Sequence, residues 1–190
     1  MPSEGIISAS VDNSVLSPHS HAMSSALQPK PRIIGHKVRI CIVASKFNEK
    51  HTDSLVENCI EELGELIPMS RIDLIRVPGA FEIPVVVAEV LEREEINCVI
   101  ALGVIIRGDT GHADLVAASV TNALQSLAVK KIIPVVHEVL LVDNEKQAHE
   151  RCNLSTGNRG RDAARAAAGI INVFAEISKT MPKDDKRKGK

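Results

Sequence analysis

A regular alternation of short apolar runs with longer amphipathic segments constrains the fold of this chain more than any other feature. The apolar runs are rich in β-branched residues and predict strands, whereas the segments between them carry the apolar spacing of helices. Strands that alternate with helices of this length predict right-handed crossovers and a parallel sheet, hence an α/β fold. We expect the four strands at Val38–Ala44, Ile72–Val77, Cys98–Ile106 and Ile132–Val142.

Capping residues and prolines place the helices between these strands. Thr52 can cap the first helix, whose apolar face includes Leu55 and Cys59, and Pro68 ends that region. His51 is expected to be an exposed residue near the start of this helix. Later helices are expected from Pro84 to about Arg93, from about Gly111 to Val129, from about Asn144 to Cys152, and from about Arg161 to Ile177.

The composition fits such a sheet and excludes several classes of function. Aromatic residues make up only 2% of the chain, so Val, Ile, Leu and Ala must fill the core. A core of this kind suits a parallel sheet that helices cover on both faces. The formal net charge of -1 argues against broad attraction to nucleic acid or membranes. No stretch reaches the roughly 18 apolar residues of a membrane span.

The four cysteines indicate reduced thiols rather than a metal site. None forms a CxxC pair, and no His lies at metal-ligand spacing from any of them. Cys41 and Cys98 fall inside apolar runs and are predicted to be small core residues. We therefore expect a cytoplasmic protein, because reduced thiols persist in that compartment.

The two ends of the chain differ from the region between them. Residues 1–36 are rich in Ser, Pro, Ala and His without hydrophobic periodicity, so we expect a disordered extension; a transit peptide is the alternative. Residues 180–190 are expected to form a charged, disordered tail, with a nucleic-acid-binding tail as the alternative. One domain is therefore expected over residues 37–179.

Polar and special residues gather where the strands are predicted to end. Ligands of parallel α/β sheets bind beyond the carboxyl ends of the strands. The segments expected there are Ser45–Asn48, Pro78–Glu82, Arg107–His112 and His137–Glu138.

The segment Gly108–His112 has the composition of an anion site. Free amides at the start of the following helix, together with the Thr110 hydroxyl, would bind an anion between Arg107 and His112. The simpler interpretation is a strand-to-helix turn with an N-cap threonine, which this segment taken alone favours.

Further candidates have side chains suited to a charged or flat ligand. Arg151 can bind phosphate in a bidentate manner, or it can simply stabilise a helix end. Arg159 is a second candidate, with an exposed surface residue as the alternative. His112 has the side chain for general acid–base chemistry. Phe47 and Phe81 can stack on a heterocycle or fill the core.

Four segments together resemble the lumazine synthase family, in order and with similar spacing over about Val38 to Ile177. They are Lys46–Asn48, Val77–Pro84, Gly103–His112 and Gly157–Gly160. The resemblance implies a flavodoxin-like three-layer sandwich with a four-stranded parallel sheet. It also implies condensation of 5-amino-6-(D-ribitylamino)uracil with 3,4-dihydroxy-2-butanone 4-phosphate to 6,7-dimethyl-8-ribityllumazine, with release of phosphate, in riboflavin biosynthesis. The implied enzyme is a transferase without a metal ion or organic cofactor.

The resemblance also implies roles for individual residues. His112 would transfer protons, Arg151 would be the counter-charge of the phosphate, and Phe47 would stack on the pyrimidine. Arg159 stands where the family usually places a lysine near the neighbouring site. The other positions implied to contact substrates are Ala80, Phe81, Glu82, Ile105, Ile106, Gly108, Asp109, Thr110 and His137.

Some positions depart from the family pattern. Ala113 stands where an aromatic residue is common, His137–Glu138 replaces a Phe-Gly pair, and Leu141–Val142 replaces a Thr-Thr pair. An active synthase is the favoured hypothesis, and the alternative is a catalytically weak lumazine-synthase-like protein that binds ligands or forms a shell. An unrelated flavodoxin-like phosphate-binding domain is a third interpretation.

The family builds each active site between two subunits of a ring. We therefore expect a homo-oligomer, a pentamer or larger, in which the Phe47 side and the Arg151 side of each site come from different chains. The Ala-rich segment Asp162–Ala168 is expected to supply close-packing surface between subunits. Small-molecule substrates are the expected ligands, without nucleic acid or a membrane as partner.

Overall fold

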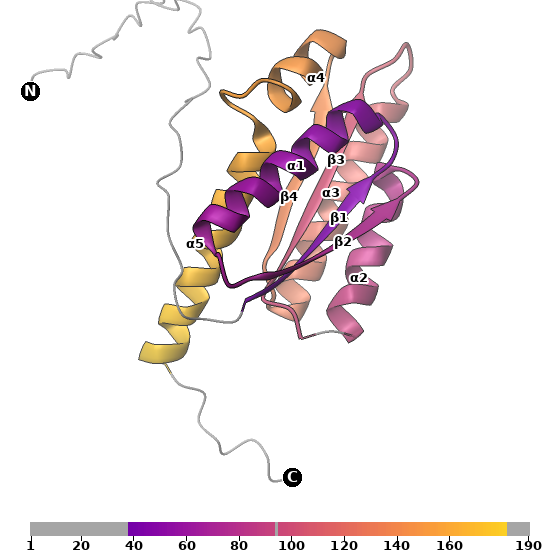
Figure 1. Cartoon of the computed structure of the whole chain (residues 1–190). Coiled ribbons are helices and arrows are strands. Elements are labelled where there is room, and N and C mark those ends of the chain that lie inside the picture. Colours follow the sequence, from indigo (N-terminus) through magenta and orange to yellow (C-terminus); the bar gives the residue numbers. More distant parts are fainter. Residues whose placement is uncertain (1–37, 94, 182–190) are drawn as a thin grey trace, which may run out of the picture.

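Four parallel strands form the centre of the molecule, and helices cover both faces of the sheet (Figure 1). The computed structural model describes residues 38–93 and 95–181. The strands are β1 (Arg39–Ser45), β2 (Arg71–Val77), β3 (Cys98–Ile106) and β4 (Val135–Val142), in the order β2-β1-β3-β4. The helices are α1 (Glu49–Leu66), α2 (Ile83–Arg93), α3 (His112–Lys131), α4 (Glu145–Cys152) and α5 (Arg159–Thr180), with a short 3-10 helix, η1 (Ala80–Glu82), before α2. The expected flavodoxin-like α/β sandwich is confirmed.

Each face of the sheet packs against its own helices, because successive side chains of a strand point to opposite faces. On one face, Ile40, Ile42 and Ile100 pack with residues of α1, α4 and α5. On the other face, Val43 and Val99 pack with residues of α2 and α3. The central strands β1 and β3 are thus buried on both sides, which is why their sequences are continuous apolar runs.

Several element boundaries differ from the prediction, and two of them have clear local causes. The fourth strand begins at Val135 rather than Ile132, because α3 continues to Lys131 and Ile132 ends it with a left-handed backbone (φ 54°). Helix α5 begins at Arg159 rather than Arg161, because the Asn158 side chain accepts a hydrogen bond from the Gly160 amide at 2.8 Å and caps the helix.

The predicted cap of α1 is wrong. Asn48, with a left-handed backbone (φ 55°), is the N-cap residue, and the helix begins at Glu49. Thr52 lies inside the first turn, fully buried, and its hydroxyl donates to the Phe47 carbonyl oxygen at 3.3 Å. A threonine that looks like a cap in sequence therefore ties the helix back to the preceding loop.

The predicted exposure of His51 is also wrong, since the residue is only 2% exposed. Its Nδ1 lies 2.5 Å from the Asn153 side-chain oxygen, and its Nε2 lies 2.7 Å from a carboxylate oxygen of Glu145. His51 of α1 therefore contacts both the first residue of α4 and the residue that follows α4.

Helices α1 and α5 approach each other closely. A Cβ atom on Gly160 would lie 2.1 Å from the backbone oxygen of Leu55, so only glycine fits at this position. The alanines of the following turns are fully buried within the chain: Ala163, Ala164, Ala167 and Ala168. These four alanines therefore pack inside the chain and supply no surface between subunits, whereas Ala166 is half-buried and lines a groove along β4, so for Ala166 the predicted role stays a prediction.

The remaining expectations concern the cysteines and the chain ends. All four cysteines are free and buried, as predicted for Cys41 and Cys98, and burial raises the pKa of the Cys98 thiol to about 12. Within the described part of the chain, none of the helices could span a membrane. Residues 1–36 and 182–190, predicted to be disordered, lie outside the described residues, whereas Thr180, predicted to begin the tail, is the last residue of α5.

Candidate active site

The carboxyl ends of β1, β2 and β3 bring three of the predicted segments to one edge of the sheet. Ser45 lies beside Val77 in the pairing of β1 with β2, and β3 ends at Ile106 on the other side of β1. We call the candidate residues on these strand ends and the loops after them the carboxyl-edge group. They are Phe47, Ala80, Phe81, Glu82, Ile105, Ile106, Gly108, Asp109, Thr110 and His112.

Phe47 is fixed through its backbone and exposed through its ring. Its amide donates to the Pro78 carbonyl oxygen at 3.0 Å. The side-chain amide of the next residue, Asn48, donates to the Val104 carbonyl oxygen at 2.8 Å and ties the loop to β3. Phe47 is nevertheless 70% exposed, so its ring does not fill the core. The loop therefore presents an aromatic face to solvent, as stacking on a heterocycle requires.

The turn before α2 presents Phe81 in a similar way. Phe81 is 60% exposed, while Ala80 beside it is buried. The Glu82 carboxylate accepts a hydrogen bond from the Gly79 amide at 2.9 Å, which fixes the start of η1. Glu82 thus shapes this turn in addition to the ligand contact that the resemblance implies.

The segment from Gly108 to Gly111 leads into an open helix N-terminus. Gly111 is the N-cap residue of α3, and no side chain caps this end of the helix, so the interpretation of Thr110 as a cap is wrong. No atom lies within 4 Å of the place that a Cβ would take on Gly108 or Gly111, so the space beside the loop is open. Uncapped amides at a helix start carry partial positive charge and bind anions. The loop has the geometry of an anion site.

Arg107 closes this loop and is already paired. Its guanidinium contacts Asp114 in the first turn of α3 at 2.6 Å, and it also contacts Asp143 after β4. The hydrogen bond with Asp114 raises the pKa of Arg107 and lowers the pKa of Asp114. Two carboxylates therefore balance the charge of Arg107, which was predicted to flank the anion site. Through these contacts Arg107 also joins the loops after β3 and β4.

His112 is the first residue of α3 and lines a cavity of about 450 Å³. The cavity also contacts Phe81, Leu115, Val116 and Ser119. The structure therefore brings the candidate proton-transfer residue together with an exposed aromatic ring and with the open start of α3.

His137 and Glu138 lie in the middle of β4, and their predicted position beyond its carboxyl end is wrong. His137 pairs with Ala101, and β4 continues to Val142, roughly 16 Å further at the usual rise of a strand. As neighbours in a strand they face opposite sides of the sheet. Nε2 of His137 lies 3.0 Å from the Thr121 hydroxyl of α3, and burial lowers the pKa of His137.

Glu138 faces α5 and pairs with Arg159. Nε of Arg159 donates to the Glu138 carboxylate at 2.7 Å, and Nη1 donates to Asp162 at 3.2 Å, so Arg159 is not a free surface cation. Burial raises the pKa of Glu138, while the charges of Arg159 and, to a smaller extent, Arg151 lower it. We call His137, Glu138, Arg151 and Arg159 the β4 group.

Two side chains that support these groups were not predicted. Arg76 of β2 donates to the Ser45 carbonyl oxygen at 3.0 Å and pairs with Asp53 of α1 at 2.5 Å, so it fixes the strand end that precedes Phe47. The sequence feature that could have indicated this role of Arg76 is a charged residue inside a predicted strand. His51 fixes α4, which carries Arg151, and its partner Glu145 lies 94 residues away, so no local pattern indicates it.

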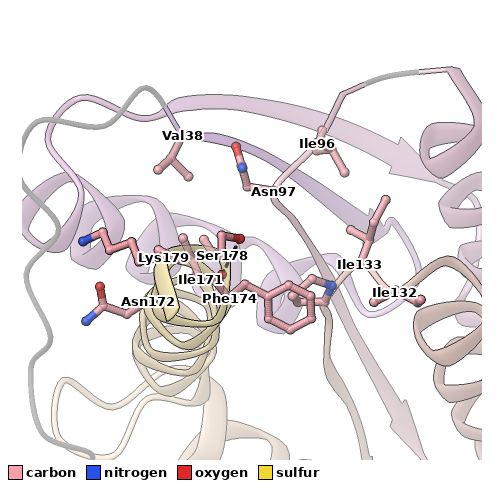
Figure 2. Close-up of a pocket in the computed structure, with 12 residues that line it drawn as sticks. Val38, Ile96, Asn97, Ile132, Ile133, Ile171, Asn172, Phe174, Ser178 and Lys179 are labelled. Atoms are coloured by element: carbon pink, nitrogen blue, oxygen red, sulfur yellow. Dashed lines mark hydrogen bonds between the residues drawn. The ribbon is translucent and has the colours of Figure 1, made fainter. Parts of the chain in front are cut away.

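Two further hollows mark the rest of the surface. A cavity of about 350 Å³ at the amino-terminal edge of the sheet is lined by residues such as Val38, Asn97 and Phe174 and by none of the candidate residues (Figure 2). An apolar groove of about 570 Å³ follows β4 between α3 and α5 and includes His137 and Glu138. Among the described residues, no cluster of His, Cys, Asp or Glu could hold a metal ion.

Known proteins are similar to this chain in sequence over a range that includes all four strands of the sheet. The family model of 6,7-dimethyl-8-ribityllumazine synthase matches residues 37–175. A 6,7-dimethyl-8-ribityllumazine synthase from Leuconostoc mesenteroides subsp. mesenteroides is 38% identical over 141 residues, which is 73% of this chain and 90% of that protein. A protein of the same name from Methylibium petroleiphilum is 37% identical over 148 residues, which is 77% of this chain and 89% of that protein. The interpretation as an unrelated phosphate-binding domain is therefore wrong, and the chain belongs to the 6,7-dimethyl-8-ribityllumazine synthase family.

Proposed function

We infer that this chain is a transferase of riboflavin biosynthesis that condenses 5-amino-6-(D-ribitylamino)uracil with 3,4-dihydroxy-2-butanone 4-phosphate to 6,7-dimethyl-8-ribityllumazine and releases phosphate. Its family and two relatives named for this product support the inference. The observation in the structure that carries it is the carboxyl-edge group, where an uncapped helix start and the imidazole of His112 adjoin the exposed ring of Phe81.

The chemistry of this reaction needs chiefly a phosphate cradle and a proton shuttle. The amine of the uracil attacks the ketone carbon and water leaves to give an imine; phosphate is then eliminated, and ring closure yields the lumazine. In our proposal, the amides and side chains of Gly108, Asp109 and Thr110 receive the phosphate. His112, at the start of α3, accepts and returns protons during imine formation and elimination.

The remaining carboxyl-edge residues would hold the uracil substrate. Phe47, whose ring is exposed on a fixed loop, stacks on the pyrimidine. Ala80 and Glu82 hold the ribityl chain, with Phe81 beside them. Ile105 and Ile106, both half-buried at the end of β3, line the pocket.

The proposal includes a site shared between subunits of a homo-oligomer, a pentamer or larger. The positions of His137 and Glu138 support a shared site, because they lie roughly 16 Å and 13 Å before the carboxyl end of their strand. The groove of about 570 Å³ along β4 adds apolar surface, including Ile132 at 74% exposed, that a neighbouring subunit would cover. Arg151 and Arg159 of one chain would then complete the carboxyl-edge group of the next.

We further propose a cytoplasmic protein that acts without a cofactor on small-molecule substrates alone. Four free, buried cysteines support a reducing compartment. The proposed catalytic domain covers residues 37–179.

A catalytically weak binding or shell-forming protein remains the second candidate, and the buried carboxylate of Glu138 beside Arg159 favours it, because negative charge opposes phosphate binding. The full-length protein is incubated with both substrates, and lumazine absorbance and released phosphate are recorded together. We expect both to appear in equal amounts. A correctly assembled protein that forms neither would support the second candidate.

A further inference from the structure

Glu138 is a buried carboxylate that contacts Arg159, one of the two arginines of the β4 group. Its side chain is 8% exposed, and it accepts a hydrogen bond from Arg159 at 2.7 Å. Arg151 lies close enough for its charge to act on the carboxylate as well. Asp162 adds a second carboxylate to Arg159 at 3.2 Å. The charge of Arg159 is therefore balanced inside the chain before any ligand arrives.

The exposed carboxylate of Glu61 gives a comparison. Glu61 pairs with Arg161, which also pairs with the buried Glu62, and the Glu61 side chain is 62% exposed, so water screens its charge strongly. The carboxylate of Glu138 is screened much less, because it lies between the sheet and α5. An anion that approaches Arg159 must therefore compete with a carboxylate already in place.

We propose that Glu138 is a positioning residue that acts as a resident counter-anion: it holds Arg159 in place and competes with phosphate for its charge, so that the β4 group binds phosphate loosely. The proposal rests on the proposed function, which assigns Arg151 and Arg159 to substrate binding. Phosphate is both part of one substrate and a product of that reaction, so loose binding favours its release.

Glu138→Gln removes the negative charge but keeps the contact, because the glutamine oxygen still accepts a hydrogen bond from Arg159. Inorganic phosphate is titrated calorimetrically into the full-length assembled protein. We expect Glu138→Gln to lower the Kd for phosphate roughly fivefold, as removal of one charge several ångströms from the ligand implies. Glu61→Gln, the same change at the exposed pair with Arg161, is the control and should leave the Kd unchanged.

A double variant tests whether Arg159 carries the effect. In an Arg159→Gln background, adding Glu138→Gln should give no further gain in phosphate affinity. A gain of the same size in that background would overturn the proposal, as would phosphate affinity in Glu138→Gln that is unchanged or lower. Absence of phosphate binding in both the wild-type protein and Glu138→Gln would overturn it as well.

If Glu138→Gln does not fold, Asp162→Asn provides the test, because its side chain is more exposed (24%) and contacts the same guanidinium. A smaller gain in phosphate affinity supports the proposal, and no gain contradicts it. Kinetics give a second readout: the KM for butanone phosphate should fall in Glu138→Gln while the KM for the uracil stays constant. The titration needs no turnover, so a wild-type protein that forms no lumazine refutes the proposed function and leaves the result on Glu138 standing.

Discussion

The carboxyl-edge group and the β4 group are built by different means. At the carboxyl edge, ligand-binding capacity lies in backbone amides and in exposed side chains, on loops that backbone hydrogen bonds fix. In the β4 group, the ligand-binding capacity lies in charged side chains, and two carboxylates hold one of them, Arg159, in place. The first group is ready for an anion without any rearrangement, whereas the second must exchange an internal partner for the ligand. The effects of substitutions in the two groups should therefore differ both in size and in the kinetic constant that changes.

The largest effect is expected from His112→Ala at the carboxyl edge. Turnover should fall about 10²–10⁴-fold, the usual contribution of general acid–base catalysis, while assembly stays intact. The kcat at saturating substrates measures it, with His149→Ala on the exposed face of α4 as the control. Turnover equal to that of the wild-type protein would remove His112 from its proposed role.

In the β4 group, Arg151→Ala should act on binding more than on the chemical step. Loss of a charged hydrogen bond, about 1.5–3 kcal/mol, should raise the KM for butanone phosphate roughly tenfold or more. Steady-state kinetics with each substrate varied in turn would show this, and Arg93→Ala at the exposed end of α2 is a matched control. An equal effect on both substrates would indicate that Arg151 only stabilises a helix end.

Mixing variants tests whether the two groups meet between subunits. Phe47→Ala and Arg151→Ala proteins are dissociated, mixed in equal amounts and reassembled. In a ring with shared sites, about a quarter of the sites should regain both residues, and activity should recover in proportion. Mixtures that stay as inactive as the separate variants, or a fully active monomer on light scattering, would contradict the shared site.

A change in packing should disturb the two groups unequally. Gly160→Ala forces a Cβ against the Leu55 backbone oxygen and should lower the free energy of unfolding by about 1–3 kcal/mol. Denaturant unfolding measures the loss, with Gly169→Ala on the same helix, where a Cβ meets no atom within 4 Å, as the control. Because Gly160 adjoins Arg159, the KM for butanone phosphate should change more than kcat.

The smallest effect concerns pH. Burial lowers the pKa of His137, so the unfolded chain binds a proton at this residue more readily than the folded chain does. The neutral side chain of His137 therefore contributes to the free energy of unfolding above the ordinary histidine pKa of about 6.5. This contribution is lost as the pH falls below that value. Unfolding curves across this range should show a weaker pH dependence in His137→Gln. An unchanged dependence would show that His137 is as solvated in the folded protein as in the unfolded one.

Local patterns were sufficient for the order of elements, the parallel sheet and three segments at its carboxyl edge, whereas the resemblance added single positions such as Ile105 and Ile106. Apolar β-branched runs indicate buried strands, and the glycines of Gly108–Gly111 mark the loop before α3, because both signals act within a few residues. The errors at Thr52 and His51 have different causes. The left-handed backbone of Asn48 starts the helix four residues before Thr52, and the Thr52 hydroxyl contacts the nearby Phe47 carbonyl oxygen, whereas His51 is buried by a partner 94 residues away.

The alternation of strands and helices in the sequence thus indicated a parallel sheet and the loops that follow its strands, because periodicity and crossover handedness are properties of local chain geometry, whereas the strand order came from the structure. Packing in three dimensions decided the rest. It turned four alanines of α5 inward against α1, directed Arg107 to two carboxylates, and placed Glu138 opposite Arg159 across α5 and β4. Contacts of this kind join residues that are remote in sequence, and an ion pair depends on burial and on a partner that no local pattern specifies.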